Sequence, residues 1–143
     1  MNVGQTPGES VPQRFLVTGQ DIAKFSTAIG YPMPPGACAP APVMFYLTMG
    51  MARGRILTRE QLGVDGLPAE ETALGGRFMA AGTEVWFHED LAVGDVVTVR
   101  QKILDDTRKT GRHGDFRLVT VQREYVGEDG RLVIDERYTR VVR

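Results

Sequence analysis

The sequence contains few of the residues that build disulfide-linked or metal-bound scaffolds. Its 143 residues include one cysteine, Cys38, and two histidines, His88 and His113. A single cysteine forms no intramolecular disulfide, and it excludes a structural zinc site built on several cysteines. The two histidines fall in separate predicted elements, so their spacing predicts no metal site. We therefore expect a fold without disulfides or bound metal.

The chain also lacks an excess of either charge and lacks a long hydrophobic run. Lys and Arg total 17 and Asp and Glu total 18, which gives a formal net charge of −1. Proteins that bind nucleic acid or a membrane surface normally carry a basic excess. The most apolar stretch, residues 37–52, contains two prolines and falls short of the roughly 20 apolar residues that span a bilayer. Because the start of the chain does not read as a signal peptide, we expect a cytoplasmic protein with no nucleic-acid or membrane partner.

The remaining composition is that of one ordinary domain. Hydrophobic residues make up 42% of the chain and charged residues 24%, which is the usual range for soluble proteins. Residues 1–13 are polar, rich in Gly and Pro, and have few large side chains to bury. We expect them to form a flexible N-terminal tail, and we expect residues 14–143 to form a single domain.

The first predicted helix lies between Thr18 and Gly30. Thr18 is a suitable N-cap, Asp21 favours the positive end of the helix dipole, and Gly30 is a typical helix stop. Helical spacing places four apolar side chains on one face: Ile22, Phe25, Ala28 and Ile29.

A second helix is predicted from about Pro42, after a loop over residues 30–42 that contains five prolines. Its segment Val43–Met51 has one polar side chain, Thr48, and no polar face. A helix of this kind is normally buried on all sides. Residues 58–80 are predicted to be irregular.

The C-terminal part of the chain reads as β-strands joined by tight turns. In one of them, residues 83–88, Val85 and Phe87 share one face while Trp86 and His88 share the other. The pattern predicts an α+β architecture, in which an antiparallel meander forms a sheet of about five strands against one buried central helix. The predicted strands lie at residues 15–17, 83–88, 96–104, 116–125 and 132–142.

Three stretches of the sequence resemble the MaoC-like dehydratase family, in its fatty-acid-synthase-like N-terminal branch. Residues 25–30 (FSTAIG) resemble the family's F-A-x-A-x-G helix end, and residues 87–95 (FHEDLAVGD) resemble its strand and V-G-D turn. Residues 109–116 (KTGRHGDF) resemble its K-x-G-R-x-G hairpin. The resemblance implies a hot-dog fold over roughly residues 14–143.

The family resemblance also implies an activity and a set of partners. Its members hydrate enoyl thioesters or dehydrate 3-hydroxyacyl thioesters that are carried on coenzyme A or acyl carrier protein. They form dimers whose acyl tunnel lies beside the buried helix, and some members are partner subunits without the catalytic pair. The dimer here is expected to be a homodimer or a heterodimer with a catalytic hot-dog subunit. No cofactor is expected, because no Gly-rich phosphate loop follows a strand.

The chain departs from the family where the catalytic residues belong. Catalytic members carry G-D-x-N-P-[IL]-[HY] after the first helix, and its Asp and His perform the acid–base work. Here the text is GYPMPPG, with Tyr31 in place of the Asp, Met33 in place of the Asn and Gly36 near the His position. A tyrosine with its usual pKa near 10 is a poor base at neutral pH. We expect that this chain alone does not run the usual reaction.

The candidate substrate-binding residues lie around this loop and on one predicted strand. Tyr31 either lines the acyl tunnel or packs as an ordinary side chain, and the methionines form either core or a pocket for an acyl chain. Backbone N–H groups of residues 36–38 are candidates to polarise a thioester carbonyl. The complete candidate set is Tyr31, Met33, Gly36, Ala37, Cys38 and Trp86.

Three hypotheses for function follow from these observations. The first is a hydratase/dehydratase component that shapes the acyl tunnel for a catalytic partner. The second is a stand-alone thioesterase or biosynthetic cyclase, with His88 as the catalytic candidate and Asp90 or Glu84 as further acid–base groups; the simpler interpretation of His88 is a residue on the sheet surface. The third is a dimer that binds an acyl or other lipophilic ligand without turnover.

Overall fold

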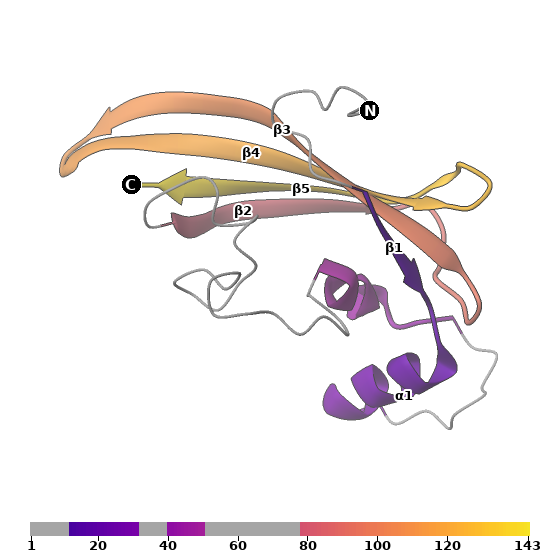
Figure 1. Cartoon of the computed structure of the whole chain (residues 1–143). Helices are drawn as coiled ribbons and strands as arrows, with labels where there is room; N and C mark the ends of the chain where they lie inside the picture. The colour runs from indigo at the N-terminus through magenta and orange to yellow at the C-terminus, as the bar shows by residue number, and fades with distance from the viewer. Residues whose placement is uncertain (1–11, 32–39, 51–77) are drawn as a thin grey trace, which may run out of the picture.

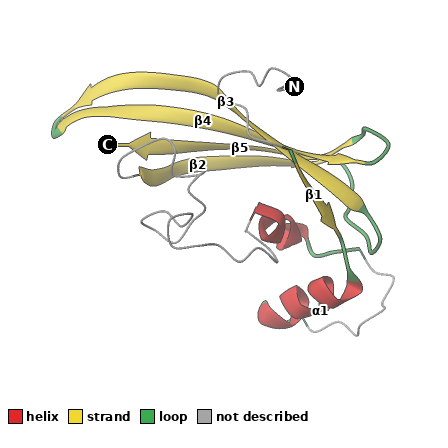
Figure 2. Ribbon diagram, viewed as in Figure 1, coloured by secondary structure: helices red, strands yellow, loops and turns green. Residues whose placement is uncertain are grey.

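The computed structural model describes residues 12–31, 40–50 and 78–143. An antiparallel sheet forms one layer, and two short helices lie on one side of it (Figures 1 and 2). The elements in chain order are β1 (Gln13–Leu16), α1 (Gly19–Ala28), the 3₁₀ helix η1 (Val43–Gly50), β2 (Phe78–Phe87), β3 (Val96–Gly111), β4 (Gly114–Gly127) and β5 (Leu132–Val142). The predicted α+β architecture with about five strands is confirmed.

The strand order is β1-β3-β4-β5-β2, with every neighbouring pair antiparallel. Strands β3, β4 and β5 form the predicted meander. The expectation that β2 belongs to the same meander is wrong, because β2 pairs with β5 at the opposite edge from β1. The segment between β2 and β3 therefore crosses the end of the sheet, which alternation of side chains along single strands does not reveal.

Helix α1 begins as predicted but buries a different face. The Thr18 hydroxyl accepts a hydrogen bond from the Asp21 backbone N–H at 3.1 Å, and Gly30 follows the helix with φ +87°. The buried side chains are those of Ile22 and Ser26, whereas Ala28 and Ile29 are exposed. The helix ends at Ala28 and Ile29 is its C-cap, so the Ile29 side chain does not follow the helical spacing that was expected to bury it.

Helix η1 is covered on one side only, so the expectation that it is buried all round is wrong. Phe45, Tyr46 and Met49 are buried, while Val43, Met44 and Leu47 are exposed. A 3₁₀ helix has three residues per turn, so side chains three positions apart share a face. Tyr46 and Met49 are accordingly buried together, and Met44 and Leu47 are exposed together, whereas Val43 at the start of the helix is exposed although it lies one turn before Tyr46.

The strands are longer than the sequence predicts. β2 starts at Phe78, inside the segment expected to be irregular, and β3 continues to Gly111. The β3–β4 hairpin therefore projects beyond the helices (Figure 1). A two-residue turn with the exposed His113 closes it, and the following Gly114 has φ +111°.

Candidate functional site

On the sheet face that η1 covers, one row of residues running across the strands is apolar and aromatic. Strand register places Val99, Tyr125, Ile134 and Phe87 side by side across β3, β4, β5 and β2. The Tyr46 ring of η1 meets the rings of Tyr125 and Phe87 edge-on, with centroid distances of 5.6 Å in both pairs. These contacts fix η1 on the sheet.

The next row across the same face is polar. Gln101 of β3, Arg123 of β4 and Glu136 of β5 lie side by side in the register, and we call these three residues the polar row. Glu136 is 5% exposed, while Gln101 and Arg123 are partly buried. Beyond this row the face becomes apolar again, with Val121 and Tyr138 at the start of a second buried cluster. The polar row thus separates two apolar clusters.

The polar row is held together by side-chain hydrogen bonds. The Arg123 Nε and Nη2 groups donate to Gln101 Oε1 at 3.2 and 2.9 Å. The Tyr138 hydroxyl donates to the same oxygen at 3.3 Å, and the Tyr125 hydroxyl donates to Glu136 Oε2 at 3.4 Å. The Arg123 guanidinium also lies 5.2 Å from the centre of the Tyr138 ring.

Burial and charge shift the protonation equilibria around the polar row. Burial by itself lowers the pKa of Arg123, but the neighbouring oxygens of Tyr125, Tyr138 and Glu136 outweigh it, so this pKa lies above its usual range. Burial raises the pKa of Tyr125, and Glu136 adds to the rise while Arg123 opposes it. The pKa of Tyr46 is raised in the same way, first by burial and then by Glu136. Near neutral pH Arg123 is therefore a cation, and the hydroxyls of Tyr125 and Tyr46 beside the row are neutral.

Sequence reasoning missed the polar row, although a signal for it exists. Alternate residues of β4 face the helices, and the series Val119, Val121, Arg123, Tyr125 contains one charged side chain among core positions. In β5 the series Ile134, Glu136, Tyr138 contains a second. Two charges at core positions of adjacent strands indicate a buried polar cluster once the register is known.

Most of the predicted loop residues lie outside the described part of the chain: Met33, Gly36, Ala37 and Cys38. Tyr31 is described. Its backbone N–H donates to the Ser26 carbonyl at 2.8 Å, and its side chain is 74% exposed. Its assignment as a tunnel residue stays a prediction.

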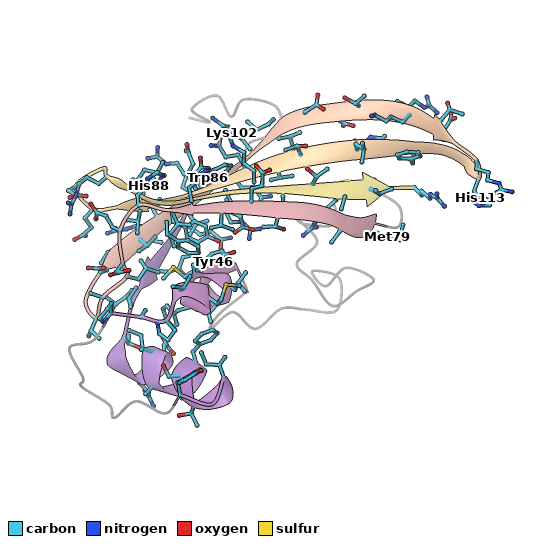
Figure 3. The ribbon with its side chains drawn as sticks, turned by 180° about the vertical axis from the view of Figure 1, so that it is seen from behind. Tyr46, Met79, Trp86, His88, Lys102 and His113 are labelled. Carbon is cyan, nitrogen blue, oxygen red and sulfur yellow. The ribbon has the colours of Figure 1, made fainter. Side chains whose placement is uncertain are left out.

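Trp86 and His88 point away from η1. Because Val85 and Phe87 face the helices, strand alternation places Trp86 on the opposite face of the sheet, and Figure 3 shows Trp86 and His88 apart from Tyr46. The Arg137 guanidinium lies 5.1 Å from the centre of the Trp86 ring. His88 is exposed, and its backbone N–H donates to the Val133 carbonyl at 2.9 Å. The structure therefore brings neither residue to the polar row.

The other acid–base candidates are no better placed. Glu84 and Asp90 are both exposed. Among the described residues, no three His, Cys, Asp or Glu side chains gather as a metal site. No helix in the described ranges is long and apolar enough to cross a membrane.

Comparison with known proteins decides the family. The model of the FAS1-like dehydratase domain region matches residues 5–136. The chain belongs to this family. The match confirms the resemblance drawn from the three sequence stretches. No curated protein sequence matches the chain significantly.

Solved structures of the same fold include several dehydratases. The chain resembles the HadBC complex of Mycobacterium tuberculosis, a 3R-hydroxyacyl-ACP dehydratase, with 16% identity over 92% of this chain and 91% of that chain (TM-score 0.63). It resembles the MaoC-like dehydratase of Rhodospirillum rubrum with 20% identity over 94% and 88% (TM-score 0.62). It also resembles the ChsH1-ChsH2 complex of M. tuberculosis with 18% identity over 94% and 84% (TM-score 0.66). At these identities the likeness establishes the hot-dog fold.

Proposed function

We propose that this chain is a component of an acyl-thioester hydratase/dehydratase that depends on a second, catalytic hot-dog subunit. The observation that carries the proposal is Tyr31, which directly follows the helix-ending Gly30 where catalytic members of the family have Asp. Tyr31 therefore lacks the carboxylate that catalytic members of the family use as an acid–base group at this position. Gly36, near the motif's His position, carries no acid–base side chain. The partner supplies the catalytic pair.

The positions of the two histidines support the proposal that the catalytic residues belong to the partner subunit. His113 lies in the turn of the β3–β4 hairpin, and His88 lies on the exposed side of the sheet. Neither approaches η1, beside which the family's acyl tunnel is expected. Two of the similar solved structures, HadBC and ChsH1-ChsH2, are complexes of two named components, which is the arrangement proposed for this chain.

Strand β2 offers a surface for the partner subunit. It is an edge strand of the described sheet, and three of its large side chains are exposed: Met79, Trp86 and Phe87. The His88 N–H already bonds to β5. Because hydrogen bonding alternates along an antiparallel strand, Thr83, Val85 and Phe87 direct their backbone groups outward. Such an edge is a template for pairing with another chain.

The test measures hydration of a short and of a long enoyl-CoA. The reaction is monitored by the loss of the enoyl-thioester absorbance. The chain is assayed alone and together with a hot-dog protein from the same organism that carries the Asp-x-Asn-Pro-x-His motif. The proposal expects turnover that requires the motif-bearing partner and increases when this chain is added. A motif Asp→Asn variant of the partner abolishes the turnover, whereas His88→Ala in this chain leaves it unchanged. Turnover by this chain alone, lost in His88→Ala, contradicts the proposal and favours the stand-alone enzyme.

A further inference from the structure

The polar row occupies a place where this fold has no structural need of charge. It crosses three adjacent strands on the helix-facing side of the sheet, between two apolar clusters. Replacing a buried ion pair with apolar residues of similar volume is often neutral or stabilising, because burying charges costs more than their attraction returns. Fold stability alone therefore does not explain why Arg123 and Glu136 lie there.

Two tyrosine hydroxyls contact the polar row through long hydrogen bonds. The O–H···O bonds from Tyr125 and Tyr138 measure 3.4 and 3.3 Å, and the Arg123 Nη2–Tyr138 Oη contact measures 3.5 Å. Well-formed O–H···O bonds are about 2.7–2.8 Å long. At these two hydroxyls a ligand oxygen therefore competes with long hydrogen bonds, while the Arg123 Nη2–Gln101 Oε1 bond of 2.9 Å holds the two side chains in place.

A ligand can reach the polar row from the β3 side of the described sheet. β1 pairs only with Val96–Val99 of β3, so at Gln101 no described strand covers the outer side of β3. Gln101 and Arg123 accordingly retain partial exposure, while Glu136 at the inner end is buried. Tyr46 of η1 packs directly beside the row, next to Tyr125.

We propose that the polar row binds an oxygen substituent, a hydroxyl or carbonyl group, carried on the acyl chain beyond the reacting carbons. The proposal rests on the function above, which places an acyl chain beside η1. Arg123 donates to the substituent, and Gln101 donates or accepts, according to which group is present. The apolar clusters on either side of the row contact the hydrocarbon that flanks the oxygen. The chain thereby selects oxygenated acyl thioesters over plain ones.

The test compares ligands that differ by one oxygen atom. Decanoyl-CoA and a series of hydroxydecanoyl-CoA isomers, each with its hydroxyl at a different carbon beyond the third, are titrated calorimetrically into the full chain, alone and with the catalytic partner. Wild type is expected to bind one hydroxylated isomer about tenfold more tightly than decanoyl-CoA, a difference of about 1.4 kcal/mol. The variants Gln101→Met and Arg123→Met/Glu136→Leu are expected to reduce this preference to near one while still binding decanoyl-CoA. The control Thr120→Val removes a polar contact to Thr139 on the opposite sheet face, and it retains the preference.

The outcomes separate the two proposals. If neither the chain nor its complex binds any acyl-CoA, the proposed function fails. If decanoyl-CoA and every hydroxylated isomer bind equally, the function stands and the polar-row inference is overturned. A preference that survives both polar-row variants, or that Thr120→Val also abolishes, overturns the inference as well. Because the double variant removes both charges together, it remains informative where Arg123→Met alone fails to fold.

Discussion

Replacing Arg123 with Met is expected to destabilise the fold far more than replacing both Arg123 and Glu136. Glu136 is 5% exposed and lies opposite Arg123 in the β4–β5 register. Glu136 acts electrostatically on Arg123, so Arg123→Met leaves the buried Glu136 without this opposite charge, a loss that costs about 3–5 kcal/mol in buried pairs. Domains are typically stable by about 5–15 kcal/mol, so Arg123→Met removes a large part of the total. Arg123→Met/Glu136→Leu removes both charges and is expected to return close to wild-type stability or above it.

Urea denaturation measures the free energy of unfolding of wild type and of both variants. With a slope of about 2 kcal/mol per molar urea, Arg123→Met lowers the midpoint by about 2 M. The matched control is Arg117→Met, because Arg117 lies on the same strand and face and pairs with Asp106 at an exposed site. Exposed pairs contribute little, so the control leaves the midpoint nearly unchanged. The reasoning is refuted if Arg123→Met shifts the midpoint no more than Arg117→Met, or if the double variant is less stable than Arg123→Met.

Three further predictions concern the cap of α1, the buried Tyr125 and the exposed side of η1. Thr18→Ala removes the helix cap and is expected to cost about 1 kcal/mol in urea denaturation, whereas Thr18→Ser costs little; equal losses in both contradict the capping role. Burial raises the pKa of Tyr125, while an unfolded tyrosine titrates near pH 10. Above about pH 10 the unfolded chain therefore holds fewer protons, so the free energy of unfolding falls with rising pH, and Tyr125→Phe makes the fall shallower. Met44→Gln and Leu47→Gln change exposed apolar side chains of η1, so the denaturation midpoint is expected to change little. Exposed apolar patches mark protein–protein contacts, so binding to the catalytic subunit, measured by sedimentation, is expected to weaken.

The sequence predicts those parts of the fold that local patterns determine. The Thr18 cap, the stop at Gly30 and the turns at Gly94 and Gly114 depend on residues within a few positions, and the structure contains all four. The sequence also located an apolar second helix, but not its one-sided burial. Apart from Thr48 the helix has no polar side chain that marks an outer face, so only contacts with strands distant in sequence distinguish Tyr46 from Leu47.

The polar row was not predicted from the sequence, because it depends on the register between strands. Gln101, Arg123 and Glu136 come from three different strands and meet only when β3, β4 and β5 align. Alternation within one strand shows that Arg123 faces inward, but it does not show which residues lie beside it. The same limit applies to β2, whose pairing with β5 instead of β3 depends on a crossing at the end of the sheet.

The division of catalysis between two subunits is tested most directly by titrating this chain into a fixed amount of the motif-bearing partner and following enoyl-CoA hydration. The account predicts that this chain has no activity by itself, and that the rate rises with each addition until the subunits reach equal amounts and then stays constant. A rate that grows in proportion to this chain without a partner contradicts the account. A rate set by the partner alone, unchanged by any amount of this chain, contradicts it equally.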